Sequence, residues 1–239
     1  MGIKNIVLIH GWGASVEKLM ALKANLQKLG WSVYLPELPG FDAKAPKTPW
    51  KLNDYVSFVY KEANSIFKNG YFVFGHSFGG RVAIRMATQE LKQVRGIILC
   101  AAGGITRSAG IRRLFFLVLA KVGRLFMVIP PLASAFKDLL YKLAREKDYY
   151  KTSGVMRVTF RNIVGEPVGG EVSAISKPTL VLWGKMDKMT PLADAYKLIG
   201  KLKKKLVKSV FFDKYGHTLP YDNSLQVAQE IDTWYKLLT

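Results

Sequence analysis

The chain has 239 residues, of which 49% are hydrophobic, and its 36 Lys and Arg against 17 Asp and Glu give a formal net charge of +19. This apolar share excludes wholesale disorder, and the length predicts one domain with a sizeable core. The single cysteine, Cys100, excludes a disulfide framework and a cysteine-based zinc site. The strong positive charge points to nucleic acid, an anionic membrane surface or an acidic partner.

Signals for export or membrane insertion are weak. The apolar run at residues 6–9 is shorter than the core of a secretory signal. The longest apolar stretch, residues 114–129, is interrupted by Lys121 and Arg124 and is short for a membrane span. We therefore expect a cytoplasmic protein, with contact to a membrane surface left open.

Short apolar runs alternate with helical patterns along most of the chain. Strands that are apolar throughout are buried on both faces of a sheet, and the helices between them act as crossover connections. The pattern predicts an α/β fold with a mostly parallel sheet of about six strands, flanked by helices. The expected strands are residues 6–9, 31–35, 71–74, 94–100, 178–183 and 206–212, and the expected helices are residues 16–29, 52–67, 78–91, 191–202 and 220–238.

Residues 105–170 interrupt this alternation. They show helical apolar patterns, a Pro130-Pro131 break and no convincing pair of strands. They also hold twelve of the 36 Lys and Arg residues with few acids, so a large share of the excess positive charge lies here. We expect a helical cap inserted at residues 105–170 between the two parts of the core, residues 1–104 and 171–239.

A serine follows the strand expected at residues 71–74. Residues 75–79 read Gly-His-Ser-Phe-Gly ahead of a helix, which is the strand–turn–helix context in which G-x-S-x-G exposes a nucleophile. The glycines permit a sharp turn, and the N-terminus of the following helix favours developing negative charge. Ser77 is therefore the candidate nucleophile, and the alternative is a serine that only caps the helix.

A serine nucleophile needs a base, and the chain has three histidines. His10 belongs to the first glycine turn, and His76 lies inside the turn of the nucleophile and points away from where a base must sit. By elimination His217, in the loop after the last strand, is the candidate base that takes the proton from Ser77.

The base in turn needs an acid that fixes its tautomer. Asp187 lies just beyond the strand expected at residues 178–183, at the carboxyl edge of the sheet. The order serine, aspartate, histidine along the chain is that of the α/β-hydrolase arrangement. Asp194 and Asp213 are less well placed competitors.

Residues 10–13, His-Gly-Trp-Gly, follow the first strand and form the second wall of a candidate oxyanion hole. Two backbone N–H groups, from Trp12 and Phe78, could converge on an acyl oxygen and stabilise a tetrahedral intermediate. The expected lining of the substrate pocket is Trp12, His76, Phe115 and Phe126. The sequence contains no metal-ligand spacing and no phosphate-binding loop, so neither a metal nor a cofactor is expected.

Together these motifs resemble the α/β-hydrolase superfamily over nearly the whole chain. The likeness rests on residues 10–13, 38–41 (Leu-Pro-Gly-Phe), 75–80, 184 with 187, and 216–217. The chain looks most like serine-nucleophile esterases, carbon–carbon-bond hydrolases and carboxylesterases that carry a helical cap. The resemblance implies that Ser77, Asp187 and His217 form a catalytic triad, that Trp12 and Phe78 are oxyanion donors, and that the cap folds over the site as a lid.

Some features depart from the family pattern. Asp42 stands close after Pro39 and Gly40, where the family usually has a glycine. The expected sheet also begins at the family's third strand. The serine at position 77 argues against haloalkane dehalogenases and epoxide hydrolases, which place an aspartate there.

The leading functional hypothesis is a serine hydrolase that cleaves carboxylic esters of short- to medium-chain acyl groups through an acyl-enzyme. The enzymatic alternatives are a lactonase, a carbon–carbon-bond hydrolase and an esterase of an acyl group on an acidic carrier protein, whose encounter a basic cap would speed. The non-enzymatic alternative is a binding module with a hydrolase fold. Nucleic acid is not expected, because no recognised motif is present; an anionic membrane surface remains a possible partner.

Overall fold

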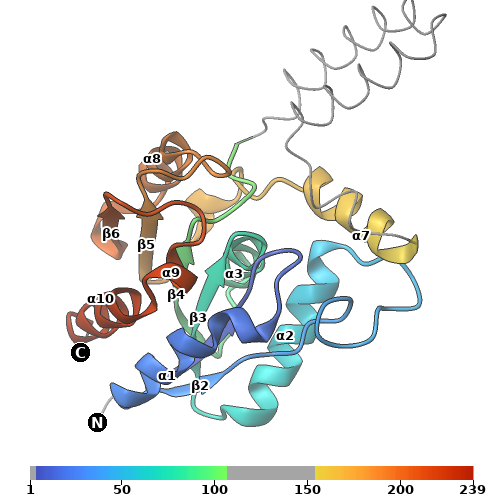
Figure 1. Cartoon of the computed structure of the whole chain (residues 1–239), viewed down its shortest axis with the longest axis horizontal. Helices are drawn as coiled ribbons and strands as arrows, with labels where there is room; N and C mark the ends of the chain where they lie inside the picture. The colour runs from blue at the N-terminus through green and yellow to red at the C-terminus, as the bar shows by residue number, and fades with distance from the viewer. Residues whose placement is uncertain (1–3, 107–153, 239) are drawn as a thin grey trace, which may run out of the picture.

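The computed structural model describes residues 4–106 and 154–238. In this part of the chain, six strands form one sheet in the order β2-β1-β3-β4-β5-β6, and every pairing between neighbours is parallel (Figure 1). The predicted α/β architecture with a parallel sheet is confirmed. The strands are β1 (Asn5–Ile9), β2 (Ser32–Tyr34), β3 (Tyr71–His76), β4 (Val94–Cys100), β5 (Thr179–Gly184) and β6 (Val207–Phe212).

Helices connect the strands and cover both faces of the sheet. Short 3-10 turns precede or join several of them: η1 (Val16–Leu19), η2 (Val172–Ala174) and η3 (Lys204–Leu206). The α-helices are α1 (Met20–Lys28), α2 (Leu52–Ile66), α3 (Phe78–Thr88), α7 (Gly154–Gly165), α8 (Leu192–Lys201), α9 (Leu219–Asp222) and α10 (Ser224–Lys236).

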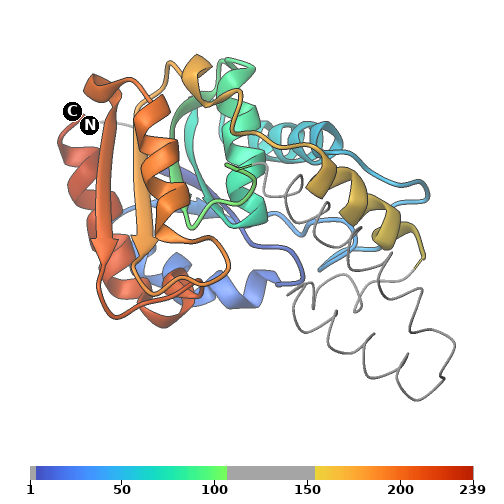
Figure 2. The ribbon, with the colours of Figure 1, turned by 90° about the horizontal axis from the view of Figure 1, so that it is seen from above.

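The sheet has two apolar cores because successive side chains of a strand point to opposite faces. On one face Ile6 of β1 is buried in a cluster with Leu22 of α1 and Ile231 of α10. On the other face the next residue, Val7, is buried in a cluster with residues of α2, α3 and α8, among them Val56. Figure 1 shows α1 and α10 side by side, and Figure 2 shows α8 close to β5 and β6. Both faces are therefore closed to water, as continuous apolar strands require.

Two of the expected helices differ from those in the structure, one at its start and one by an internal break. The segment expected at residues 16–29 begins as the 3-10 turn η1 before α1. The closing segment, residues 220–238, is divided into α9 and α10 by Asn223, whose backbone has φ −138° and ψ 46°. The Asn223 side chain donates to Gln226 Oε1 at 2.7 Å. The backbone angles at Asn223 lie outside the α-helical region, so the helix is interrupted there.

The expected cap, residues 105–170, is only partly described, since residues 107–153 lie outside the described part. Its last segment, α7, is tied to the loop before α2: the Trp50 N–H donates to Thr159 Oγ1 at 3.0 Å, and Asn162 Nδ2 donates to the Trp50 carbonyl at 3.1 Å. In Figure 2, α7 lies at the opposite side of the molecule from β6. Ile105 and Val168, near the two ends of the expected insertion, are buried in the core around α3.

Among the helices of residues 4–106 and 154–238, none is both long enough and apolar enough to cross a membrane.

The turn between β3 and α3 brings three backbone segments into direct contact. Ser77, the one residue between these elements, has φ 52° and ψ −107°, a conformation that side-chain-bearing residues seldom adopt. A Cβ atom on Gly75 would overlap the Gly79 carbonyl oxygen, and one on Gly79 would overlap the Ile9 carbonyl oxygen. Glycine at these positions is what allows β1, β3 and α3 to approach closely enough to hold the strained serine.

We expect Gly79→Ala to lower the free energy of unfolding by at least about 2 kcal/mol, because the added methyl group can be accommodated only by moving β1 or α3. The matched control is Gly200→Ala in α8, where an added Cβ meets no atom within 4 Å. That change should leave stability unchanged or raise it by up to about 1 kcal/mol. Urea unfolding followed by circular dichroism measures both, and equal effects of the two substitutions would contradict the close packing described here.

Candidate active site

The residues singled out in the sequence follow the carboxyl ends of four strands. Trp12 comes after β1, Ser77 after β3, Asp187 after β5 and His217 after β6. Because the sheet is parallel, these ends lie along one edge, which is where open α/β sheets bind their ligands. The edge holds a cavity of about 220 Å³. Its lining includes Trp12, Ser77, Phe78, Arg81, Thr190 and His217, together with Phe160, Ile163 and Val164 of α7.

His217 and Asp187 form a hydrogen-bonded pair at this edge. Asp187 Oδ2 lies 2.9 Å from His217 Nδ1, and the carboxylate is 5% exposed. A carboxylate only accepts hydrogen bonds, so the proton of the neutral imidazole is assigned to Nδ1. Nε2 of His217 is then left as a proton acceptor.

Asp187 accepts four hydrogen bonds, and three of them come from its own loop. Its Oδ1 accepts from the Met189 and Thr190 N–H groups at 2.8 Å each, and its Oδ2 accepts from the Thr190 hydroxyl at 2.7 Å as well as from His217. Burial would raise the pKa of Asp187, but the hydrogen bonds from His217 and Thr190 outweigh it and hold the pKa below its ordinary value. Asp187 is therefore ionised and fixed in position at neutral pH.

Thr190 is a site residue that the sequence reasoning missed. Besides its bonds to Asp187, its hydroxyl lies 3.3 Å from His217 Nδ1 and from the Ala101 carbonyl oxygen. Thr190 stands three residues after Asp187, a spacing at which an aspartate commonly binds backbone N–H groups of its own loop. This spacing is the signal from which the sequence could have identified Thr190. The contact between Thr190 and Ala101, directly after β4, has no counterpart in the local sequence.

Ser77 and His217 line the same cavity. Among the hydrogen bonds of residues 4–106 and 154–238, none joins the Ser77 hydroxyl to the His217 ring. Nucleophile–base hydrogen bonds are often long without substrate and tighten when it binds. The arrangement thus places Ser77, the candidate nucleophile, at one cavity with the hydrogen-bonded His217–Asp187 pair, and no hydrogen bond joins Ser77 to His217.

His76 is buried beside His217 and does not line the cavity, although the sequence reasoning placed it in the substrate pocket. Its Nε2 lies 2.7 Å from the His217 carbonyl oxygen, and its Nδ1 lies 2.8 Å from the Tyr221 hydroxyl. The carbonyl can only accept, so Nε2 carries the proton and Nδ1 accepts from Tyr221. Burial, with His217 as the next cause, lowers the pKa of His76 to about 3. Neutral His76 thus links the turn of Ser77 to the backbone of His217.

Trp12 and Phe78, the two candidate oxyanion donors, line the same cavity as Ser77. Phe78 is the first residue of α3, where backbone N–H groups have no intrahelical acceptor. The ring of Trp12 packs edge-on against Phe78 with centroids 5.5 Å apart, and it contacts Phe160 of α7 at 5.0 Å. Trp12 therefore forms part of the cavity wall between the core and α7.

Asp42, the departure from the family pattern, holds the loop that carries Trp12. Its Oδ2 pairs with His10 Nε2 at 2.9 Å, and its Oδ1 accepts from the Val16 N–H at 2.9 Å. His10 is 1% exposed, so its pairing takes place inside the protein. One carboxylate thus ties together both ends of the loop from β1 to η1. Phe115 and Phe126, the other expected pocket residues, lie outside the described part of the chain.

The match to known families is decisive for classification. A family model described as the alpha/beta hydrolase family matches residues 6–230. The chain belongs to the alpha/beta hydrolase family. The match covers most of the chain and includes all four loops at the carboxyl edge of the sheet.

Curated relatives of this hydrolase match over a shorter stretch. It is 30% identical over 99 residues to a pimeloyl-[acyl-carrier protein] methyl ester esterase of Shewanella woodyi, and 30% identical over 101 residues to the protein of that name from Photorhabdus laumondii. These alignments cover 41% and 42% of this chain. They span only 36% and 37% of the relatives, roughly a third of their length.

Solved structures agree with the fold over the whole chain. An esterase from Exiguobacterium antarcticum superposes with a TM-score of 0.73 at 18% identity, covering 99% of this chain and 93% of that one. A metagenomic alpha/beta hydrolase from lagoon sediments of Mar Chica, Morocco, superposes with a TM-score of 0.70 at 16% identity, covering 98% and 91%. At these identities the likeness establishes the fold alone.

The neutral state of His76 makes stability depend on pH. A histidine in the unfolded chain has a pKa near 6.5, whereas His76 in the folded chain has a pKa of about 3. Below pH 6.5 the unfolded state therefore binds a proton that the folded state does not. We expect this difference to remove about 2 kcal/mol of unfolding free energy between pH 6.5 and 4.5.

Urea unfolding at a series of pH values measures this loss, and His76→Gln is the comparison. Glutamine is neutral at all these pH values, so the variant should lose about 2 kcal/mol less than the wild type over the same interval. The groups that influence His76, namely His217, Asp187 and His10, are present in both proteins, so the comparison isolates the His76 ring. Identical pH dependence in the two proteins would contradict a buried neutral His76.

Proposed function

We propose that this hydrolase cleaves carboxylic esters through an acyl-enzyme formed on Ser77. The observation that carries the proposal is the His217–Asp187 hydrogen bond of 2.9 Å at the edge of a cavity that Ser77 also lines. A buried, ionised aspartate that holds one imidazole nitrogen protonated leaves the other nitrogen free to accept the proton of a serine hydroxyl. Family membership and the esterase relatives support the same class of reaction.

In the proposed reaction His217 Nε2 removes the proton from Ser77 as Oγ attacks the ester carbonyl carbon. The negative charge that develops on the carbonyl oxygen is stabilised by the N–H groups of Trp12 and Phe78. The protonated His217 then gives its proton to the leaving alcohol, which breaks the carbon–oxygen bond of the ester and leaves an acyl group on Ser77. His217 then deprotonates a water molecule, which attacks the carbonyl carbon of the acyl group. As the bond between this carbon and Ser77 Oγ breaks, His217 returns the proton to Oγ, and the carboxylic acid leaves.

The cavity suits a small acyl group. A volume of about 220 Å³ lies below the range of about 300–1,000 Å³ for drug-sized ligands, and aromatic and aliphatic side chains such as Trp12, Phe160 and Ile163 form much of its wall. We therefore propose short- to medium-chain acyl esters as substrates. Lactones and substrates with a cleavable carbon–carbon bond meet the same nucleophile and serve as comparison compounds.

A second candidate substrate is an ester on an acyl group carried by an acidic carrier protein. The relatives from Shewanella woodyi and Photorhabdus laumondii are named for activity on a pimeloyl-[acyl-carrier protein] methyl ester. The formal net charge of +19 would attract an acidic protein. The exposed residues Arg157 and Arg161 of α7 stand next to side chains of the same helix that line the cavity. An acidic carrier docked over α7 would therefore bring its acyl group to Ser77.

For the esterase proposal, we expect Ser77→Ala to lower kcat/KM on short-chain p-nitrophenyl esters by a factor of about 10⁴ or more. The variant should also fail to react with a serine-directed fluorophosphonate that labels the wild type. The matched control is Ser57→Ala, an exposed serine of α2, which should retain full activity and labelling. A folded wild type that neither hydrolyses any ester or lactone nor takes up the label would favour a binding module.

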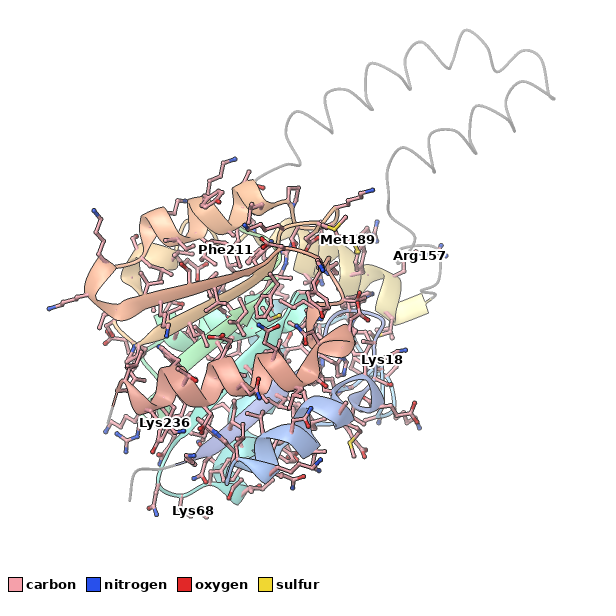
Figure 3. The ribbon with its side chains drawn as sticks, turned by 60° about the vertical axis from the view of Figure 1, so that its left-hand side comes forward. Lys18, Lys68, Arg157, Met189, Phe211 and Lys236 are labelled. Atoms are coloured by element: carbon pink, nitrogen blue, oxygen red, sulfur yellow. The ribbon has the colours of Figure 1, made fainter. Side chains whose placement is uncertain are left out.

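For the carrier candidate, we expect kcat/KM on a methyl ester of a carrier-bound acyl group to fall about 10-fold or more between about 0.05 M and 0.5 M salt. A free methyl ester should change less than about twofold, because it has no charge to be steered. Arg161→Glu should raise KM for the carrier substrate alone. Lys68→Glu is the matched control, since Lys68 precedes β3 at the opposite edge of the sheet and lies far from Arg157 in Figure 3. Equal salt dependence for both substrates would exclude electrostatic carrier recognition.

A further inference from the structure

A partly buried arginine, Arg81, lines the cavity that contains Ser77 and His217. Arg81 is the fourth residue of α3, one helical turn beyond Phe78, and its side chain forms part of the cavity wall. Burial lowers the pKa of Arg81 to about 10, and the nearby charge of Glu166 acts in the opposite direction. Arg81 is therefore still a cation at neutral pH. A charge that is partly withdrawn from water gains from a partner, because desolvating an unpaired guanidinium is costly.

The hydrogen bonds of Arg81 use only one of its nitrogens. Nη1 donates to the Ile163 carbonyl oxygen at 2.8 Å and to the Glu166 carbonyl oxygen at 3.3 Å. Neither acceptor is a carboxylate. Among the ion pairs of the described residues, none includes Arg81, whereas Arg85, one turn further along α3, pairs with Glu171 at 2.8 Å. The positive charge of Arg81 is therefore not balanced by direct contact with an acid of the described chain.

The backbone at Gly104 holds the guanidinium in place. Gly104 has φ +78°, and a Cβ there would lie 2.6 Å from Arg81 Cζ and 2.8 Å from both Nε and Nη1. The Gly104 backbone thus lies close to the guanidinium, near its Cζ, Nε and Nη1 atoms, and the carbonyl groups of Ile163 and Glu166 accept hydrogen bonds from Nη1. The Nε–Nη2 edge has no hydrogen-bond partner among the described residues. That edge presents two parallel N–H groups, which match the two oxygens of a carboxylate.

We propose that Arg81 binds a carboxylate group of the substrate, so that the preferred esters carry a carboxylate some atoms away from the scissile carbonyl. The proposal rests on ester hydrolysis at Ser77 and names the substrate class of that site. The acid Asp194 lines the same cavity, and its Oδ1 accepts from the Thr106 hydroxyl at 3.0 Å. The acids Asp194 and Glu166 lie nearby and oppose the positive charge of Arg81, so the cavity attracts anions only weakly from a distance. Selection of a substrate carboxylate therefore depends on direct contact with the Arg81 guanidinium.

The test compares matched pairs of esters that differ only in a terminal carboxylate or carboxamide. One series is the monomethyl esters of linear dicarboxylic acids, and the other is the acetyl esters of ω-hydroxy acids, so that the carboxylate stands on the acyl or on the alcohol side. Chains of about two to six methylene groups bracket the axial rise of roughly 6 Å between Ser77 and Arg81 on α3. Hydrogen bonds to a charged group contribute about 1.5–3 kcal/mol. We therefore expect kcat/KM to favour the carboxylate by roughly 10- to 100-fold in at least one pair.

Arg81→Gln should lower kcat/KM for the carboxylate esters until the two members of each pair react about equally, because glutamine cannot provide the charge or the paired donors. Arg85→Gln removes a positive charge from the same helix outside the cavity and is the matched control, which should keep the preference. A wild type that shows no preference in either series overturns the proposal. If Arg81→Gln lowers kcat/KM equally for carboxylate and carboxamide esters, the proposal is also overturned. The role of Arg81 is then to hold the end of α7.

A binding measurement separates failure of this proposal from failure of the esterase reaction. Calorimetric titration of free glutarate and adipate into the Ser77→Ala variant reports on the subsite without catalysis. We expect binding that is at least about 10-fold weaker in the Ser77→Ala, Arg81→Gln double variant. If the wild type hydrolyses no ester but the dicarboxylates bind in this Arg81-dependent way, the esterase proposal fails and the carboxylate site stands. If no dicarboxylate binds to a protein that hydrolyses neutral esters, the carboxylate site fails alone.

Discussion

The backbone contacts that the start of α3 makes with β1 and β3 are the constraint on which the site depends. They require glycine at position 79, against β1, and at position 75, in β3, and they hold Ser77 at φ 52°. The same close approach brings the loop after β1, with Trp12, beside the first turn of α3, with Phe78 and Arg81. A strained serine, two candidate oxyanion donors and a partly buried cation thereby line one cavity.

Buried polar groups hold the remaining parts in register. Asp187 is surrounded by donors from its own loop and from His217, while His76 connects the His217 backbone to Tyr221. The loop before η1 is tied by Asp42 through His10. In a low-dielectric interior, satisfied polar networks of this kind are stiff, and an unpaired member is costly. Arg81 differs from these groups because its Nε and Nη2 atoms donate no hydrogen bond to the described residues.

Most of the fold could be predicted from the sequence because its signals are local. Continuous apolar runs predicted each of the six strands to within two residues at either end, and β4 matches its predicted range of 94–100. The ends of helices were harder to predict from the sequence. Asn223 divides the closing segment through its backbone geometry, which the pattern of apolar residues does not indicate. Among site residues, Ser77, Asp187 and His217 stood out since each follows a strand at the carboxyl edge. Thr190 was signalled only by its spacing of three residues from Asp187, and Tyr221, which contacts His76 from 145 positions away, gave no local signal.

The sequence by itself determined the class of fold, the glycine turn around Ser77 and the edge of the sheet at which the candidate residues meet. These follow from hydrophobic periodicity and from glycine stereochemistry, which act over a few neighbouring residues. Only the tertiary structure decided which polar groups are satisfied and which face the cavity. Arg81 donates to carbonyl groups 82 and 85 positions away in the chain. Its guanidinium lies beside Gly104, and its Nε–Nη2 edge donates no hydrogen bond to the described residues. Contacts over such separations depend on packing, so no local pattern encodes them.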